Sequence, residues 1–536
     1  MRRTTLLSIA PALCAGLLLS ACTVGPDYKG PPQVAANAAA RGSFVRAGDA
    51  VRPDAPAATW WTALNDPVLD QLIADALAGS PDIAVANARI AQARAGLAAN
   101  KTAVLPTFNV SAATPYVNVP GGLLSSDGQS GGRDSFTVYN VGFDASWEID
   151  LFGGTRRKIE AASARSQAAE ASLADAQVTL SAEVARTYVG LRTRQQALIV
   201  LDRQAQIDDA LVSLAGQRLS SGTAPEQPLD QLRAQRAQTE ADRAKARAET
   251  TVLIDQLAVL TGREPGSLDA QLATAAPIPL PPAEVAIGDP SLLLRSRPDI
   301  RAAERQLAAA NADVGVQIAN RFPKLSILGL IGLGGQDIGD VLDPSKVIGL
   351  ALPQLKWSLF DGGRTEAQIR NAKGAYAEAE ANYRAAVLRG LQDAEGSLTR
   401  FGGQRTAYAQ SVIAQQQAER AATLQGQRFR GGTVGRSDAL SAERTALQSA
   451  LGAATARGDL TNSFIAVEKS LGLGWTSGSK RASVVAAGSE NEPSASRCSI
   501  FSSDHFRSSL ISTQNAAKAN EREERWTGFR TWVVAC

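Results

Sequence analysis

The side chains that most often carry out chemistry in proteins are almost absent from the body of this chain. Between Thr23 and Arg497 the sequence contains no histidine, cysteine or methionine. Residues of these three types occur only near the two ends of the sequence: Met1, Cys14, Cys22, Cys498, His505 and Cys536. Imidazole bases, thiol nucleophiles, zinc sites with His or Cys ligands and thioether copper sites are therefore excluded over that range.

Carboxylates are the remaining candidates for catalysis. Asp144 and Glu148 share one face of a predicted strand, where a carboxylate-dependent envelope hydrolase is a remote alternative. A water-filled lumen explains the same two residues better, so we expect no enzyme, no metal site and no cofactor. The 55 basic and 52 acidic residues nearly balance, and this balance does not favour nucleic acid as a partner.

The N-terminus predicts export and lipidation. Arg2 and Arg3 precede an apolar stretch at 6–19, which is shorter than the roughly 20 residues of a spanning helix and fits a signal peptide. Leu-Ser-Ala followed by Cys22 resembles a bacterial lipoprotein processing site, with Cys22 as the acylated residue. Thr23, rather than aspartate, follows it. By analogy with bacterial lipoproteins, this predicts sorting to the outer membrane.

The segment from Thr137 to about residue 149 alternates strictly between apolar and polar side chains. The apolar face contains Tyr139, Val141, Phe143, Ala145, Trp147 and Ile149. Such a pattern fits a half-buried strand in a soluble sandwich as well as a membrane strand with aromatic ends. The predicted lipoprotein processing site and outer-membrane sorting favour the membrane strand.

Three further strands are predicted, at 105–116, 323–333 and 347–359. Alternation is weaker in the second pair, because Leu328, Leu330 and Leu352 occupy the face expected to be polar. Helices are predicted before the first strand pair, at 66–79 and 83–101, from apolar residues at helical spacing and from the Asp66–Pro67 start signal.

A long helix follows each strand pair. The stretch 155–220 has no proline and predicts a rod of about 100 Å. Val184, Leu191, Leu198 and Ala205 recur every seven residues, as in a coiled-coil seam. The rods are expected to turn near Gly222 and Gly432, and helices at 229–260 and 437–471 to return.

The two halves are separated by a constant spacing. "QRLSSGT" at Gln217 and "QRFRGGT" at Gln427 stand 210 residues apart, as do Trp147 and Trp357. The predicted organisation is a signal peptide at 1–21, an acylated tether at 22–63, a first repeat at 64–265, a linker at 266–288, a second repeat at 289–475 and an atypical, disordered tail at 476–536.

Four strands in one chain cannot seal themselves against lipid, because each unpaired backbone group costs several kcal/mol in hydrocarbon. Three copies would supply twelve strands and enclose a lumen. The expected fold class is therefore mainly α with membrane β: four transmembrane β-strands per chain, a 12-stranded barrel as a homotrimer, and long coiled-coil-like helices forming a periplasmic tunnel.

Four stretches resemble a known family: "ACTVGPDYKGPP", "WWTALNDPVLDQLIADAL", "RSRPDIRAAERQLAAANADVGVQIANRFPKLSILG" and "FDGGRTEAQI". They resemble TolC-type outer-membrane factors of the NodT subgroup, over about residues 22–475. The resemblance implies a passive outer-membrane conduit for small molecules. It also implies a periplasmic adaptor (membrane fusion) protein and an inner-membrane pump of the resistance, nodulation and division type as partners.

In this family the periplasmic end is closed by residues just after the turn of the second long helix. The resemblance implies that Arg444 is the gate arginine. Ser441 stands where an aspartate is usual, and Ser437 where a bulky apolar residue is usual, so a tightly latched gate is in doubt. Asp438 is a partial substitute, and Asp230 is the polar candidate in the first repeat. A solvated surface charge is the other interpretation of Arg444.

A lipid-anchored periplasmic coiled-coil adaptor is the second hypothesis for the whole chain. It requires lipoyl-like or barrel segments between its helices in place of paired membrane strands. The sequence does not identify the exported substrate, the cognate pump or a role for residues 476–536.

Overall fold

Two copies of one element pattern form the part of the chain that the computed structural model describes, residues 23–120 and 133–475. These residues belong to one unit ending at Ser477, and a second unit begins at Gly478. The predicted signal peptide, the candidate lipidation residue Cys22 and the predicted tail at 476–536 lie outside the described residues.

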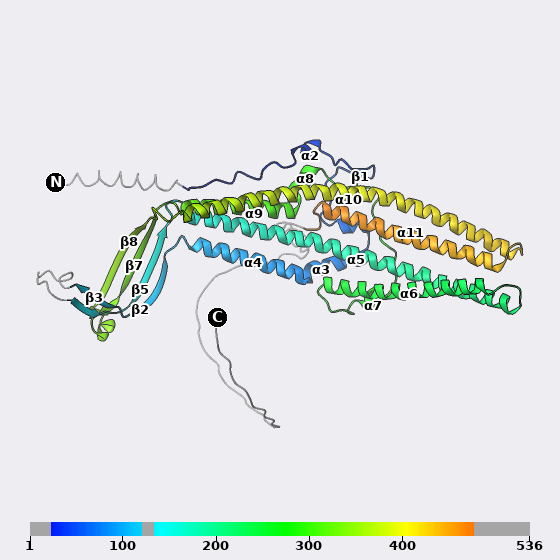
Figure 1. Cartoon of the computed structure of the whole chain (residues 1–536), viewed down its shortest axis with the longest axis horizontal. Coiled ribbons are helices and arrows are strands. Elements are labelled where there is room, and N and C mark those ends of the chain that lie inside the picture. Colours follow the sequence, from blue (N-terminus) through cyan, green and yellow to red (C-terminus); the bar gives the residue numbers. More distant parts are fainter. Residues whose placement is uncertain (1–22, 121–132, 476–536) are drawn as a thin grey trace, which may run out of the picture. The chain divides into compact units, whose positions relative to one another are not determined.

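The first copy contains a helix pair, a strand pair and a long helix that turns back. Its elements are α3 (Pro67–Gly79), α4 (Pro81–Thr102), β2 (Thr107–Ala113), β5 (Tyr139–Ile149), α5 (Gly154–Ser220) and α6 (Gln227–Leu260). The second copy repeats this order with α8 (Pro290–Ser296), α9 (Pro298–Ala319), β7 (Lys324–Gly335), β8 (Val347–Lys356), α10 (Arg364–Arg430) and α11 (Arg436–Ser470). The predicted duplication is thus present element by element (Figure 1).

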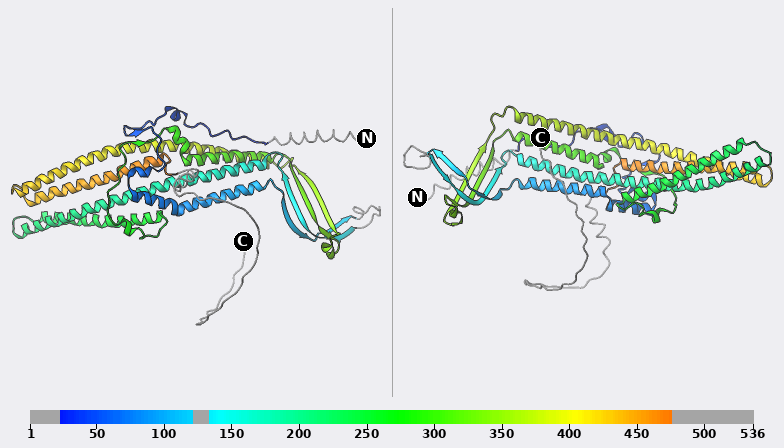
Figure 2. Two further views of the ribbon diagram at one scale, coloured as in Figure 1. Left: turned by 180° about the vertical axis from the view of Figure 1, so that it is seen from behind. Right: turned by 60° about the horizontal axis from the view of Figure 1, so that its bottom comes forward.

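Two short features were not predicted from the sequence. The first strand ends at Ala113, and the chain continues into β3 (Tyr116–Pro120), which pairs with β4 (Arg133–Thr137) as a separate antiparallel hairpin. The connection between β7 and β8 contains one turn of 3-10 helix, η2 (Ile338–Leu342). Both lie at the end of the strands remote from the helices (Figures 1 and 2).

The four long strands form one antiparallel sheet in the order β2-β5-β7-β8. The central pair joins the two copies, with Phe143 opposite Ile331 and Trp147 opposite Ile327. Val110 of β2 lies opposite Phe143, so the apolar side chains of neighbouring strands share one face. Within this sheet, only β2 and β8, at the two edges, have one side without a strand partner among the described residues.

The apolar face of this sheet is exposed in the single chain. Phe108, Val110, Phe143, Ile331 and Leu355 each have more than half of their accessible surface open. A patch of large apolar side chains on this scale requires a covering phase or partner. The exposure therefore agrees with the membrane interpretation of the strands rather than with a soluble sandwich.

The opposite face is polar on the first pair of strands and mixed on the second. Asp144 lies opposite Asn109 on β2 and opposite Leu330 on β7, and Leu328 lies opposite Leu352. The sequence predicted this mixture from the three leucines at polar positions.

Each strand-to-helix junction is built around a left-handed glycine and an aspartate. Gly153 and Gly363 precede α5 and α10 with φ of +80° and +86°, a region that favours glycine. Asp150 accepts the backbone N–H groups of the first turn of α5, and Asp361 does the same for α10. The chain thereby changes direction without leaving the first N–H groups of the helix unpaired.

Both long helices contain 67 residues and extend about 100 Å. The largest fully buried side chains lie where α3, α5, α6 and α11 meet, and they include Tyr188, Phe464, Leu69, Leu191 and Leu257. Trp60 packs edge-on against Phe464 with ring centroids 6.0 Å apart. Over the described ranges, no helix combines the length and the apolarity needed to cross a membrane.

The segment predicted as a tether contacts both copies. It contains α2 (Ala36–Arg41), β1 (Val51–Arg52) and η1 (Trp60–Leu64), and β1 pairs in parallel with β6 (Val285–Ala286) in the inter-repeat linker. The linker also contains α7 (Asp269–Leu272). Phe44 is buried, and the carboxylate of Glu395 on α10 accepts the N–H groups of the next two residues.

A pair of glycines allows a close approach of the two copies within the sheet. Gly142 lies opposite Gly332, and a Cβ at residue 142 would lie 2.6 Å from the carbonyl oxygen of Ile331. We expect Gly142→Val to destabilise the sheet by about 3 kcal/mol or more and to lower the yield of folded protein strongly. Gel electrophoresis measures this yield as the band whose mobility changes on heating. Gly349→Val is the matched control, because a Cβ at residue 349 meets no atom within 4 Å. Equal yields of the two variants would contradict the packing inferred here.

Candidate functional site

The two helix turns have the same geometry. Gly222 and the glycine at the equivalent place in the second turn have φ of +71° and +72°. In the first turn, the N–H and Oγ1 of Thr223 donate to the carbonyl of Arg218 at 2.9 and 3.0 Å. In the second turn, Thr433 donates to Arg428 at the same two distances. The turns therefore hold the ends of α5–α6 and α10–α11 in one common conformation.

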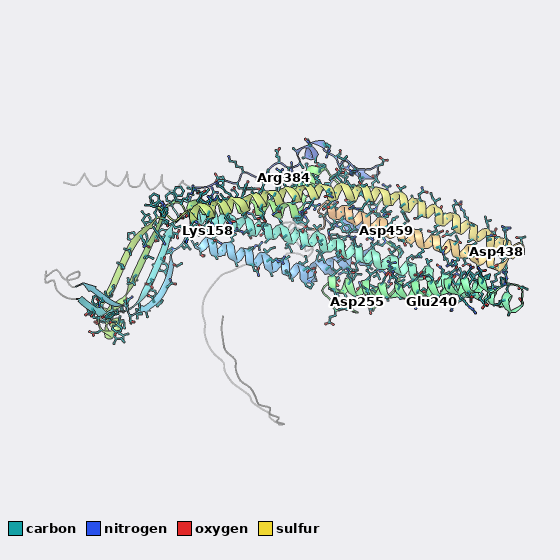
Figure 3. The ribbon with its side chains drawn as sticks, viewed as in Figure 1. Lys158, Glu240, Asp255, Arg384, Asp438 and Asp459 are labelled. Atoms are coloured by element: carbon teal, nitrogen blue, oxygen red, sulfur yellow. The ribbon has the colours of Figure 1, made fainter. Side chains whose placement is uncertain are left out.

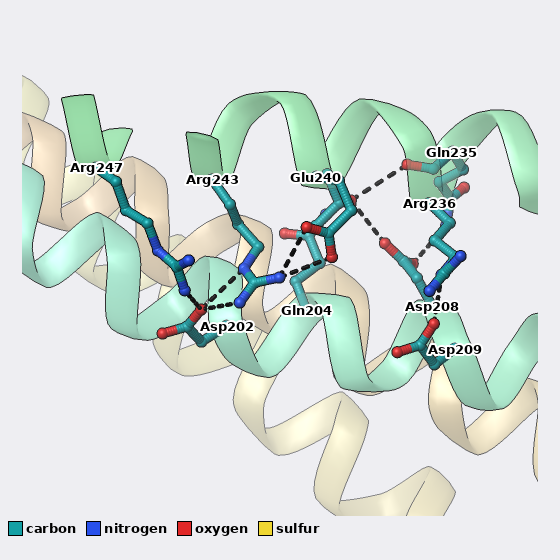
Figure 4. Close-up of polar contacts among 10 residues, drawn as sticks. Asp202, Gln204, Asp208, Asp209, Gln235, Arg236, Glu240, Arg243 and Arg247 are labelled. Carbon is teal, nitrogen blue, oxygen red and sulfur yellow. Dashed lines mark hydrogen bonds and ion pairs between the residues drawn. The ribbon is translucent and has the colours of Figure 1, made fainter. Parts of the chain in front are cut away.

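Close to these turns, a carboxylate is buried where three helices meet. Asp208 of α5 has a fully buried side chain. The Nε2 of Gln235 donates to its Oδ1 at 2.9 Å, and the Oγ1 of Thr239 donates to its Oδ2 at 2.6 Å, both from α6 (Figure 4). The Nε of Arg444, on α11, lies 3.0 Å from Oδ1. We call these four residues the Asp208 cluster.

The Asp208 cluster links α5 to both returning helices. The contact with Arg444 is an ion pair whose Nε–H is not aligned as a hydrogen bond. The guanidinium retains about a fifth of its exposure, whereas the carboxylate retains none. A buried carboxylate that loses its cation is costly, so separation of α11 from α5 at this level is opposed by the desolvation of Asp208.

A ladder of more exposed ion pairs continues along the α5–α6 face. Asp202 accepts from Arg243 at 2.6 Å and lies 3.5 Å from Arg247, while Arg243 also donates to Glu240 (Figure 4). Pairs with this much exposure contribute little each. Their position fixes the register of the two helices.

One further pair joins α5 to α11. Arg203 donates to Glu443 at 2.7 Å, one residue before Arg444 in the chain. Two neighbouring positions of α11 thus carry opposite charges and meet opposite charges on α5. This arrangement favours one rotation of α11 about its axis over the others.

The structure separates the residues predicted as gate candidates. Arg444 contacts Asp208 and is not a fully solvated charge. Asp438, at the turn end of α11 (Figure 3), accepts the N–H of Gly435 at 3.2 Å and thus closes the start of its own helix. Ser437 receives a 3.5 Å contact from Arg218, and the Ser441 side chain is exposed.

Among the residues that the structure describes, Asp230 forms an ion pair only with Arg233, one turn further along α6 at 3.3 Å, and both side chains are largely exposed. The predicted candidates therefore do not form one cluster. Among them only Arg444 enters a buried polar contact between helices.

Sequence reasoning missed Asp208, although a signal for it exists. Asp208 lies three residues after Ala205 and seven after the buried Leu201, which is the second apolar position of the heptad seam. A carboxylate at a seam position requires a partner from a facing helix, and Arg444 is that partner.

The lumen candidates lie on the mixed face of the sheet, opposite the exposed apolar face. Asp144 and Glu148 are on the same face of β5, and Glu148 lies 3.8 Å from the Nζ of Lys324. Among residues 23–120 and 133–475, no group of three or more His, Cys, Asp or Glu side chains is placed to hold a metal ion.

Comparison with known proteins identifies relatives over most of the chain. The family model described as "Outer membrane efflux protein" matches residues 72–263 and 290–473. The chain is 30% identical to the pyoverdine export outer membrane protein OpmQ of Pseudomonas putida, over 78% of this chain and 89% of that protein. It is 28% identical to nodulation protein T of Rhizobium leguminosarum bv. trifolii, over 71% and 79%.

A solved structure supports the same relationship. The outer-membrane channel OprN superposes with a TM-score of 0.76 at 31% identity, covering 85% of this chain and all of that one. The fold predicted from the sequence, with membrane strands and long helices in one chain, is confirmed by these comparisons.

A second buried carboxyl group, that of Glu468 in α11, differs from Asp208 of α5 in having no cation beside it in the described part of the chain. Glu468 is almost completely buried, and its Oε2 has no hydrogen-bond partner among the described residues. Burial raises the pKa of Glu468 from 4.5 to about 8. The folded protein therefore keeps this carboxyl protonated at neutral pH.

The raised pKa predicts a dependence of stability on pH. The contribution of Glu468 to the free energy of unfolding is fully present below pH 4.5 and is lost as pH rises toward 8, because this carboxyl ionises at a lower pH in the unfolded chain than in the folded one. At pH 8 we expect Glu468→Gln to be more stable than the unsubstituted chain by up to a few kcal/mol, and therefore to unfold at a higher temperature. The difference in unfolding temperature should shrink at pH 5. Thermal unfolding across this range measures it, with Asp459→Asn as the exposed control on the same helix. A difference that does not change with pH would contradict the assignment.

Proposed function

The chain belongs to the outer membrane efflux protein family, and from this premise we propose that three copies form one conduit that the Asp208 cluster holds closed at its helix turns. The protein itself is an outer-membrane efflux channel. It is a passive conduit and not an enzyme, so the energy for export comes from elsewhere. The observation that carries this function is the direct continuation of the exposed apolar sheet into 67-residue helices.

The trimer follows from the edges of the sheet. In the part of the chain that the structure describes, β2 and β8 are the two edges of the four-stranded sheet, and the outer side of each lacks a strand partner. In hydrocarbon unpaired backbone groups cost several kcal/mol each, and pairing β8 of one copy with β2 of the next removes that cost. Twelve strands enclose enough space for a lumen, whereas eight leave an interior filled by side chains.

The proposed partners follow from the length of the helices. Rods of about 100 Å place the two turns far from the sheet, where they are available to a periplasmic adaptor protein. An inner-membrane pump of the resistance, nodulation and division type would then supply the energy. We propose small molecules as the cargo, and outer-membrane lipid as the partner of the exposed sheet face and of an acylated Cys22.

The adaptor hypothesis lacks its required feature in the described residues. An adaptor needs lipoyl-like or barrel segments between its helices, and the four long strands here form a single sheet with one exposed apolar face. This arrangement and the family match favour the conduit.

Gating is assigned to the Asp208 cluster because it is the buried polar link near the turns. Opening moves α11 relative to α5, and this motion separates Arg444 from a carboxylate without solvent access. The neighbouring Arg203 pair is exposed and opposes the motion much less.

Channel recordings test the gate. We expect Arg444→Gln to raise the open probability in planar bilayers by about ten- to a hundredfold, because the closed state then contains a buried carboxylate without its cation. Asp208→Asn should also open the channel, since it removes the other charge. Arg233→Gln is the control, because the Arg233 pair with Asp230 is exposed and lies within one helix. An unchanged open probability in both cluster variants would reject the gate assignment.

A separate measurement tests the trimer. We expect the full chain, extracted from outer membranes in mild detergent, to run as a heat-modifiable species with three times the mass of one chain. A folded monomer after extraction would reject the closure argument and leave the fold of the single chain unaffected.

A further inference from the structure

The first described residues of the chain form a strap over the seam between the two repeats. This N-terminal strap, residues 23–28, crosses from the start of α5 to α9, two helices that pack along each other. The N–H of Val24 donates to the carbonyl of Phe152 at 3.1 Å, in the turn that connects β5 to α5. The strap therefore begins at the boundary between strands and helices.

The side chain of Arg157, in the first turn of α5, binds the strap. This side chain is only 4% exposed. The guanidinium donates to the carbonyls of Val24 and Gly25 at 3.3 Å each and to the carboxylate of Asp27 at 2.6 Å. A fourth contact, with Glu160 at 2.7 Å, orients the guanidinium from its own helix. Planar multidentate donation of this kind is specific to arginine.

Glycines allow the close approach of strap, α5 and α9. A Cβ at Gly25 would lie 2.5 Å from the Cα of Gly315, and φ at Gly25 is +95°. A Cβ at Gly315 would lie 3.0 Å from the Arg157 side chain. A Cβ at Gly153 would lie 2.6 Å from the side chain of Thr23. Gly25 and Gly153 also have positive φ, so only glycine fits these two positions without displacement of the strap, whereas a Cβ at Gly315 would press on the Arg157 side chain.

The second half of the strap is bound to the second repeat. Asn311 donates to the carbonyl of Pro26 at 2.9 Å, and the hydroxyl of Tyr28 donates to Glu304 at 2.8 Å. The guanidinium of Arg305 lies 5.8 Å from the centre of the Tyr28 ring. The strap thus contacts α5 with one end and α9 with the other.

Aromatic side chains place this junction at the level of a membrane surface. The indole N–H of Trp147 donates to Val104, and that of Trp357 donates to Arg321, both at 3.0 Å. Both indoles are partly exposed at the helix end of the sheet. Exposed tryptophans at the border of an apolar strand face are typical of the interfacial belt of membrane proteins.

We propose that the N-terminal strap docks on α5 and α9 and thereby fixes the lipid anchor at this boundary. Arg157 is the main residue that binds the strap. The proposal rests on the acylation of Cys22 in the proposed function. In the sequence, Cys22 directly precedes Thr23, the first residue of the strap. Because Thr23 packs on Gly153, the acyl chains enter the membrane beside the strand-to-helix junction.

The docked strap differs from a free tether in how far the anchor can move. A flexible segment of about 40 residues, the length that precedes η1, would let its end range over roughly 35 Å. Docking makes the residue next to the anchor, Thr23, part of the folded protein. The acyl chains then set the height of the sheet in the membrane and hold the two repeats together at their shared seam.

Trypsin cleavage after Lys29 tests the docking. Lys29 is exposed directly after the strap, and cleavage there releases the lipopeptide 22–29 once the strap has left its site. With the full chain in detergent, we expect Arg157→Gln to speed this release by about tenfold or more, as measured by mass spectrometry. Arg165→Gln is the matched control, because Arg165 also joins α5 to α9, through Asp313, and does not contact the strap.

A variant within the strap guards against unfolding as the cause. Gly25→Ala leaves Arg157 and every side chain between α5 and α9 unchanged, and we expect its Cβ, which would overlap Gly315, to speed release as Arg157→Gln does. Release as slow as in the control for both variants would overturn the docking, even if the channel conducts. Fast release in both variants, with an unsubstituted chain that does not conduct, would instead reject the proposed function and keep the docked strap.

Discussion

The backbone groups along the two free edges of the sheet impose the constraint on which the rest of the architecture depends. One chain supplies four strands, and β2 and β8 each have an unpaired edge among the described residues. In water such edges are tolerable, but beside hydrocarbon they are not. The exposed apolar face makes hydrocarbon the expected surroundings of these strands. In the proposed trimer, other copies pair with these edges, and the long helices continue the bore that the strands enclose.

Duplication satisfies this constraint with one structural solution used twice, although the two copies differ in detail. The tryptophans at the strand ends are 210 residues apart and make the same hydrogen bond. The aspartates that close the first turns of α5 and α10 are 211 residues apart, so they reach the helix from different positions. The two aspartates do the same thing from positions that differ by one residue. The fold therefore requires the geometry of the turn rather than an aspartate at one fixed position.

Much of this fold is predictable from periodicity, whereas the polar contacts are not. Alternation in β5 and heptad spacing in α5 give the elements and their faces, because burial along one element repeats at a fixed interval. Asp208 and Arg444 are 236 residues apart in sequence, and no local pattern states that they meet. The strap was predicted as a tether because its composition resembles one. Its docking depends on Arg157 and on glycines of two other segments, which only the tertiary structure brings together.

Helix α5 carries the candidate elements for both anchoring and gating, at opposite ends. Arg157 and Asp208 are separated by 51 residues, which corresponds to about 75 Å of helix. A continuous helix transmits rotation and tilt along this length and does not shorten. In the proposed gate, movement of α11 at the turns therefore changes the angle of α5 at its strand end. At that end, the strap and the stacked rings of Phe152 and Phe322, 4.7 Å apart, resist the change by joining both repeats. In the proposed channel the gate can therefore move while the sheet stays closed, because several buried contacts resist motion at the junction and one largely buried ion pair resists it at the turns.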